Sequence, residues 1–190
     1  MNYVVMDLEW NRPLSKQRMI RDPFKLKGEI IQFGAARIDS LENMNIVDKF
    51  SEVVKPVYYT KMHKEVTSVT DITDETINKG RPFKEVCDEF LKWCGDDYAF
   101  VTWSGNDIYM LEDNMCMHDM DIDGLPECYD VQVMFDDQVT QDDRSFALSY
   151  AMWKFGIKPE YTHDALNDAI NTVEVMKRLD FSEGLAGYEV

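Results

Sequence analysis

Apolar and polar positions along this chain follow two different periods, which predict where strands and helices lie. The apolar run of residues 3–8 predicts a buried strand that ends among acidic side chains. Residues 29–39 and 46–54 predict two more strands, and the short polar link 40–45 favours an antiparallel meander of all three. A further apolar run, residues 99–103, is expected to extend the sheet.

After residue 59 the pattern becomes helical. Thr73 can cap a short helical turn that Gly80 ends, and Pro82 stands where a longer helix begins. Beyond Pro82, apolar residues recur at intervals of three and four, as on one buried helix face. Residues 129–135 fit either a strand or a short helical turn. Other helices are expected at residues 63–68, 106–117, 145–155 and 164–179.

Length and composition are those of a folded globular chain. At 190 residues, the chain fits one domain (1–190, core about 3–180), and its strand-rich start followed by alternating elements predicts an α/β fold with a helix-covered mixed sheet. No apolar run approaches the roughly 18 residues of a membrane span. We therefore expect no membrane partner and, without a signal peptide, a cytoplasmic location. Four cysteines without CxxC spacing predict reduced, mostly buried thiols.

The charge distribution is more informative than the net charge of −16, which alone argues against a nucleic-acid partner. Residues 11–27 contain six basic residues and one acidic residue. A solvated loop is the simplest interpretation of such a run. Because the run directly follows Asp7 and Glu9, its Arg and Lys side chains are also candidates for holding substrate phosphates.

Acidic residues beside apolar segments form the main chemical pattern. Asp7 and Glu9 lie two apart on a strand and so share one face, Asp107 begins a helix, and Asp168 lies in the last helix, just after His163. Converging carboxylates suit a pair of Mg²⁺ or Mn²⁺ ions about 4 Å apart, which can promote phosphodiester displacement. A histidine beside them is suited to act as a general base at neutral pH.

These motifs, in this order, resemble those of the DEDDh 3′-5′ exonucleases, the superfamily that includes RNase T and the proofreading subunit of bacterial polymerase III. The resemblance rests on DxE at Asp7 and Glu9, on Asp107 in a W-x-x-x-D-x-x-x-L context, and on H-x-A-x-x-D from His163 to Asp168. The segments GEIIQFGAARID and DITDETINKGRPFKEVCDEF add to it. The EWN sequence after the first aspartate is most similar to the branch containing KapD and the histone-mRNA exoribonucleases.

The resemblance implies an RNase H-like fold with a mixed five-stranded sheet, and release of 5′-nucleoside monophosphates from the 3′ end of single-stranded RNA or DNA. RNA is weakly favoured over DNA as the partner, and the sequence does not decide between them. The resemblance also implies that Asp7, Glu9, Asp107 and Asp168 hold two Mg²⁺ or Mn²⁺ ions and that His163 deprotonates the attacking water. The expected substrate-binding residues are Leu8, Trp10, Arg12, Arg18, Arg21 and Trp103.

Two other functions remain open at this stage. One is a regulatory, protein-binding domain with little catalytic role, although such a domain has no reason to keep four acids and a histidine. The other is the proofreading subunit of a DNA polymerase.

Residues 119–130 resemble an EF-hand calcium loop. However, Asp130 replaces the usual glutamate at the last position, and Pro126 removes a backbone N–H, so we expect a polar connection there.

Overall fold

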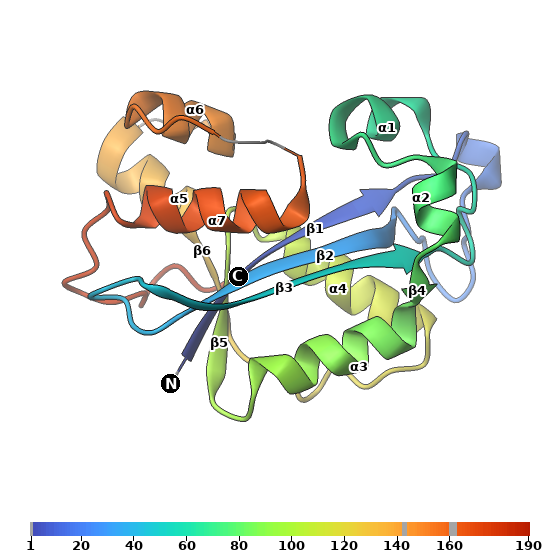
Figure 1. The fold of residues 1–190 in the computed structure, drawn as a ribbon, viewed down its shortest axis with the longest axis horizontal. Coiled ribbons are helices and arrows are strands. Elements are labelled where there is room, and N and C mark those ends of the chain that lie inside the picture. Colours follow the sequence, from blue (N-terminus) through green and yellow to red (C-terminus); the bar gives the residue numbers. More distant parts are fainter. Residues whose placement is uncertain (1, 142–143, 160–162) are drawn as a thin grey trace.

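The computed structural model describes residues 2–141, 144–159 and 163–190, and its centre is a six-stranded sheet (Figure 1). The strand order is β4-β3-β2-β1-β5-β6. The strands are β1 (Asn2–Asn11), β2 (Glu29–Ile38), β3 (Ile46–Lys55), β4 (Arg81–Pro82), β5 (Tyr98–Thr102) and β6 (Cys128–Asp130). The helices are α1 (Lys64–Thr70), α2 (Asp74–Asn78), α3 (Phe83–Cys94), α4 (Asn106–Met117), α5 (Val131–Phe135), α6 (Leu148–Lys154) and α7 (Ala165–Met176), with a 3₁₀ turn (Lys16–Arg18) and a π-helical turn (Asp136–Thr140).

The sheet is mixed, as the sequence predicts. β1, β2 and β3 form the expected antiparallel meander, whereas β5 runs parallel to β1, and β6 runs parallel to β5. The sheet has one strand more than the five expected, because the two residues of β4 pair in parallel with β3. Two residues are too few to show a period in sequence. The ambiguous segment 129–135 contains both structures, since β6 ends at Asp130 and α5 begins at Val131.

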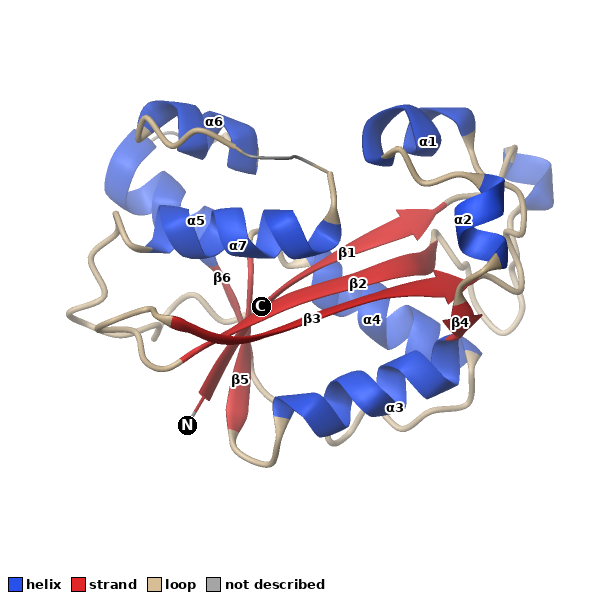
Figure 2. Cartoon of the chain, viewed as in Figure 1, coloured by secondary structure: helices blue, strands red, loops and turns tan. Residues whose placement is uncertain are grey.

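Helices cover both faces of the sheet, with α3 and α4 on one face and α5, α6 and α7 on the other (Figure 2). The alternation of β1 divides its side chains between these layers. Val4, Met6 and Leu8 pack in the cluster formed with α3 and α4, whereas Val5 packs in the cluster formed with α7. By the same alternation, the acidic side chains at positions 7 and 9 belong to the face that α7 covers.

Several local predictions agree with the structure. The helix expected at residues 106–117 is α4, with the same bounds, and Thr73 caps α2 by accepting a hydrogen bond from the Thr76 N–H. Residues 118–127 form the expected connection between α4 and β6. All four cysteines are free thiols, and three of them are buried. None of the helices in the described residues has the length and apolar character that crossing a bilayer requires.

Candidate active site

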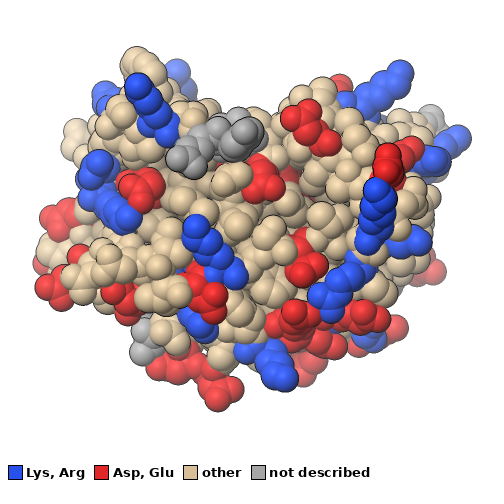
Figure 3. All heavy atoms as spheres, viewed as in Figure 1, with Lys and Arg blue, Asp and Glu red and all other residues tan. Residues whose placement is uncertain are grey.

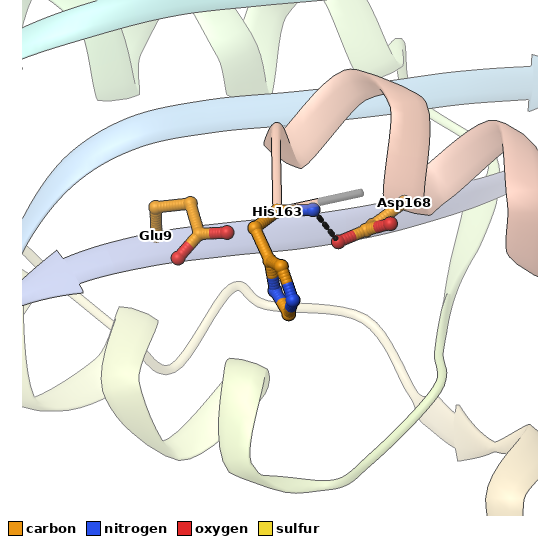
Figure 4. Close-up of side chains that lie close together, drawn as sticks. All are labelled: Glu9, His163 and Asp168. Atoms are coloured by element: carbon orange, nitrogen blue, oxygen red, sulfur yellow. Dashed lines mark hydrogen bonds between the residues drawn. The ribbon is translucent and has the colours of Figure 1, made fainter. Parts of the chain in front are cut away.

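Three of the predicted site residues meet where β1 passes the start of α7 (Figure 4). Carboxylate oxygens of Glu9 and Asp168 and an imidazole nitrogen of His163 all lie within 4.8 Å of one another. The backbone N–H of His163 donates to Asp168 Oδ2 at 2.8 Å, which fixes the loop against the first turn of α7. His163 itself has a left-handed backbone (φ 61°) and an exposed side chain, so its imidazole is open to solvent and substrate.

Asp107 joins this group from the other helical layer. It lies buried in the first turn of α4. Its Oδ1 accepts a hydrogen bond at 3.0 Å from the N–H of Leu8, the residue between the two acidic residues of β1. Asp7 is close enough to Asp107, Glu9 and Asp168 for each to act on its charge. The structure thus brings together all four predicted acids and the predicted histidine.

Crowding and removal from water oppose ionisation of these carboxyl groups. Burial, followed by the charges of its acidic neighbours, raises the pKa of Asp7 well above its usual range. Burial together with the nearby Asp168 and Asp107 raises the pKa of Glu9 to about 8. Burial raises the pKa of Asp107 to about 7, against the lowering effect of the hydrogen bond from Leu8. Such a site has a strong electrostatic preference for binding cations.

Two residues that the sequence analysis did not single out hold α7 against the sheet. Gln32 lies opposite Glu9 in the β1/β2 register. Its Nε2 donates to Asp164 Oδ2 at 2.8 Å, and its Oε1 accepts from the Ala165 N–H at 3.2 Å. Asp164 also caps α7 by accepting from the Asn167 N–H. Gln32 and Asp164 therefore fix the start of the helix that carries Asp168.

Asp130 has a similar positioning role on the other side of the site. One of its carboxylate oxygens accepts from the Gly105 N–H at 2.9 Å, and the other caps α5 by accepting from the N–H groups of Gln132 and Val133. Because Gly105 immediately precedes α4, this contact ties the helix that carries Asp107 to β6. Sequence reasoning treated Asp130 only as part of the discounted EF-hand pattern.

Comparison with known proteins gives this arrangement a family. A family model for the RNase T exonucleases matches residues 4–176, which is most of the chain. The chain belongs to the RNase T exonuclease family. It is therefore a nuclease-type hydrolase domain, and the predicted membership of the DEDDh superfamily is confirmed.

The curated relatives of this exonuclease domain are much longer proteins. The DNA polymerase III PolC-type of Thermotoga maritima is 28% identical over 150 residues, which cover 79% of this chain. The chain spans 10% of the length of that relative. The PolC-type polymerase of Thermotoga petrophila is similar to the same extent, at 27% identity.

Solved exonuclease structures share the fold. The nuclease domain of 3′hExo, a DEDDh family member bound to rAMP, has a TM-score of 0.81 at 16% identity, covering 100% of this chain and 96% of that one. Exonuclease I of E. coli, in complex with a dA16 oligonucleotide, has a TM-score of 0.70 at 15% identity, covering 95% of this chain and 41% of that one. The expected RNase H-like, mixed α/β architecture is confirmed.

Two of the expected substrate-binding side chains lie in the core of this exonuclease domain. Leu8 is 3% exposed and packs under α4, so only its backbone N–H reaches the site. Trp103 is 7% exposed, and its Nε1 donates to the Phe146 carbonyl at 3.1 Å. The prediction that these side chains contact substrate is corrected for both. Leu8 follows Asp7 in a strand, so its side chain points to the opposite face of the sheet. Trp103 packs beneath the site.

Trp10 and Arg12 lie where substrate can reach them. With Glu9 they line a cleft of about 330 Å³, whose other wall is α1. Arg12 crosses this cleft to pair with the carboxylate of Glu65, and the α1 side chain Val69 is exposed at its edge. The space-filling surface is hollowed between the part that carries α6 and the part that carries α1 (Figure 3).

The remaining predicted substrate residues, Arg18 and Arg21, are exposed, and neither lines the cleft beside Glu9. Arg18 lines a separate small cavity of about 110 Å³, which it shares with Arg12, Tyr59 and Lys61. The basic segment therefore leaves the site as expected, but only its first part adjoins the cleft.

We expect the metal-free protein to lose stability as the pH rises from about 5.5 to about 8.5. Glu9 titrates at about 8 and Asp107 at about 7 in the folded protein, whereas both types titrate near 4 in an unfolded chain. The folded state thus binds more protons within this window, so the free energy of unfolding falls as pH rises. Melting temperatures in EDTA should be about 10 °C lower at the higher pH, and the difference should be smaller in Glu9→Gln. A melting temperature that rises with pH would contradict this.

Gly34→Ala should both destabilise the domain and slow its reaction. Gly34 is the β2 partner of Asp7, and a Cβ there would lie 2.0 Å from the backbone carbon of Ala165. The start of α7 would have to move off the sheet, and overpacking of this kind costs about 1–3 kcal/mol. Because Asp168 moves with α7, kcat should fall at least about tenfold.

Urea unfolding and single-turnover hydrolysis measure these two effects of Gly34→Ala. Gly124→Ala is the matched control, because a Cβ at Gly124 meets nothing within 4 Å. Wild-type stability and rate in Gly34→Ala would show that α7 does not depend on this close approach.

Proposed function

We propose that this chain is a 3′-5′ exonuclease domain that hydrolyses single-stranded RNA or DNA from its 3′ end and releases 5′-nucleoside monophosphates. The observation that carries the proposal is the convergence of four carboxylates with an exposed histidine inside an exonuclease-family fold. The described residues contain no other group of three or more potential metal-ligating side chains of this kind. Chemistry at any other place in the described structure therefore lacks comparable support.

The four acids fit a site for divalent cations. Their ligand atoms are hard oxygens, which Mg²⁺ and Mn²⁺ prefer, and they come from β1, α4 and α7, so the site is rigid. Burial raises the pKa values of Asp7, Glu9 and Asp107, and acidic neighbours add to the effect at Asp7 and Glu9, so a divalent cation bound among them would offset their charge. When bound, two such ions supply positive charge that stabilises both the attacking and the leaving oxygen of a phosphodiester displacement.

His163 is suited to take the proton from the attacking water. Its imidazole lies beside Glu9 and Asp168 but faces solvent, and the hydrogen bond from its backbone N–H to the Asp168 carboxylate holds the residue in place. The bond between phosphorus and the 3′ oxygen of the preceding nucleotide breaks as water attacks phosphorus. The terminal nucleotide then leaves with a 5′ phosphate, and the 3′ oxygen of the shortened strand takes up a proton from solvent to become a 3′ hydroxyl.

The cleft beside Glu9 is the place for the terminal nucleotide. It combines one aromatic side chain, Trp10, with the apolar side chains of α1 and a cation at Arg12, which suits a base and its phosphate. Breaking the Arg12–Glu65 pair would make that guanidinium available to the substrate.

Oligonucleotides labelled at either end test the polarity and the substrate. With Mn²⁺, a 5′-labelled strand should shorten one nucleotide at a time, whereas a 3′-labelled strand should release labelled mononucleotide at once. EDTA should stop both reactions. RNA and DNA strands run in parallel identify the preferred sugar, and accumulation of mononucleotide from the 5′ label at the earliest times would refute the 3′-5′ direction.

The similarity to PolC-type polymerases favours one second candidate, a proofreading activity on DNA. A proofreading enzyme should prefer a DNA primer with a mismatched 3′ end over the same primer fully paired. Equal or better hydrolysis of single-stranded RNA would favour an RNA-trimming role instead.

A further inference from the structure

An array of aromatic side chains lies on α6 and on the segment before it, with Phe146 and Tyr150 half-buried against the core and Trp153 exposed. The rings of Phe146 and Tyr150 are stacked with centroids 4.4 Å apart, and Trp153 continues the array 5.6 Å beyond Tyr150. Arg144 lies over the other end, with its guanidinium carbon 5.3 Å from the centre of the Phe146 ring. Trp153 is 71% exposed, more than any other large hydrophobic side chain in the described ranges. The Trp153 ring is tilted by 41° from that of Tyr150, and its exposed indole offers a face to a further ring.

Three basic residues accompany this array in the sequence. Residues 144–159 contain these three and no acidic residue, and the stretch lies between Asp142 and Asp143 on one side and Glu160 on the other. Apart from this stretch and the basic segment 11–27, the chain has 11 basic and 35 acidic residues. Basic side chains accordingly appear over α6 in the space-filling view, beside the central hollow (Figure 3). Lys154 directly follows Trp153, and both Lys154 and Lys158 are exposed.

The array is also tied to the elements that carry the site. The Phe146 carbonyl accepts hydrogen bonds from Trp103 Nε1 at 3.1 Å and from Gln132 Nε2 at 2.7 Å. Trp103 stands four residues before Asp107, and α6 packs against α7, which carries Asp168. The buried Trp103 thus supports the array instead of contacting the substrate itself.

We propose that Trp153, backed by Tyr150 and Phe146, forms a stacking platform for unpaired bases of the nucleic-acid substrate, upstream of the 3′-terminal nucleotide. Arg144, Lys154 and Lys158 supply the positive charge for the phosphates of the same stretch. The inference rests on the proposed function, because a strand that enters the site by its 3′ end leaves its 5′ portion outside. Every base has a face that can stack on an indole, so the platform recognises single strands without reading their sequence.

Binding without cleavage tests the platform apart from the catalysis. Fluorescence anisotropy in EDTA at low salt compares a 12-nucleotide and a 3-nucleotide single strand on wild type, Trp153→Ala and Trp153→Phe. We expect Trp153→Ala to bind the longer strand about tenfold more weakly, as for the loss of one stacked base, and Trp153→Phe to recover most of that affinity. The shorter strand should bind all three proteins equally.

Steady-state kinetics with Mn²⁺ give a second readout. Trp153→Ala should raise KM for the longer strand, while kcat and the hydrolysis of thymidine 5′-p-nitrophenyl phosphate stay unchanged. Replacing Lys154 and Lys158 together by glutamine should reduce the slope of log Kd against log salt by about 1.4, since each lost phosphate contact in a single strand removes about 0.7. Val47→Ala, an exposed apolar residue on β3, is the control and should change nothing.

Equal affinities of wild type and Trp153→Ala for the longer strand would overturn the platform and leave the proposed exonuclease activity intact. Loss of self-association in Trp153→Ala, seen by sedimentation without a change in nucleic-acid affinity, would also overturn it, because α6 would then be a protein interface. Wild-type binding with no cleavage in Mn²⁺ would refute the proposed function instead.

Discussion

Asp7→Asn is expected to abolish hydrolysis and, at the same time, to stabilise the metal-free protein. Asparagine keeps the shape of the side chain but cannot ionise. It therefore removes the negative charge that Asp107, Glu9 and Asp168 repel. Loss of one ligand from a two-ion site should lower kcat by at least about 1,000-fold, which corresponds to about 4 kcal/mol of transition-state stabilisation. Because the pKa of Asp7 is raised, its cost to folding grows with pH, so the gain in stability should be small near pH 5 and clear at about pH 8.5.

Thermal melting with EDTA and with Mn²⁺ separates the two effects of Asp7→Asn. Wild type should melt higher with Mn²⁺, because a ligand that binds only the folded state stabilises it. The variant should melt higher than wild type in EDTA and respond less to Mn²⁺. Asp96→Asn, which removes an equal charge from an exposed turn, should resemble wild type in both respects. An active Asp7→Asn, or one with an undiminished response to Mn²⁺, would exclude Asp7 from the cation site.

Local patterns in the sequence were sufficient for the motifs and for the elements that carry them. The period of two in β1 placed Asp7 and Glu9 on one face, opposite Val4 and Met6, as the two core clusters show. The helix expected at residues 106–117 has the bounds of α4. The alternation of a strand and the extent of a helix are set by residues that are close together in the sequence. Intrinsic propensity and burial favour the same structure at these positions.

The contacts that orient the site had no local signal. Gln32 bonds Asp164 across 132 positions, and Gly34 is required only because α7 passes over β2 there. In the sequence, Gln32 is an ordinary polar residue within a strand, and its partner is identified only once the chain has folded. Trp103 shows that closeness in the sequence is also an insufficient guide. It lies near Asp107 in the sequence, yet its indole is buried.

His163→Asn is expected to slow hydrolysis while leaving cation binding intact. Positioned general bases contribute about 10²- to 10⁴-fold, so kcat should fall within that range and KM should change little. Asparagine is the appropriate replacement, because position 163 has a left-handed backbone that asparagine tolerates better than alanine. The backbone N–H to Asp168 is also retained, so the first turn of α7 keeps its anchor.

The decisive measurement on His163→Asn is its thermal response to Mn²⁺, because the geometry allows two roles. The imidazole lies within 4.8 Å of carboxylate oxygens of Glu9 and Asp168, which is near enough for it to act either as a base beside the cations or as a ligand to one of them. A base can be removed without loss of cation affinity, so His163→Asn should gain as much melting temperature from Mn²⁺ as wild type does. If the imidazole is a ligand, its removal must lower the affinity for the cation. A smaller gain in melting temperature from Mn²⁺ than in wild type would therefore reassign His163 to the cation site. His63→Asn, at the start of α1, serves as the control for loss of a histidine elsewhere and should keep wild-type kcat.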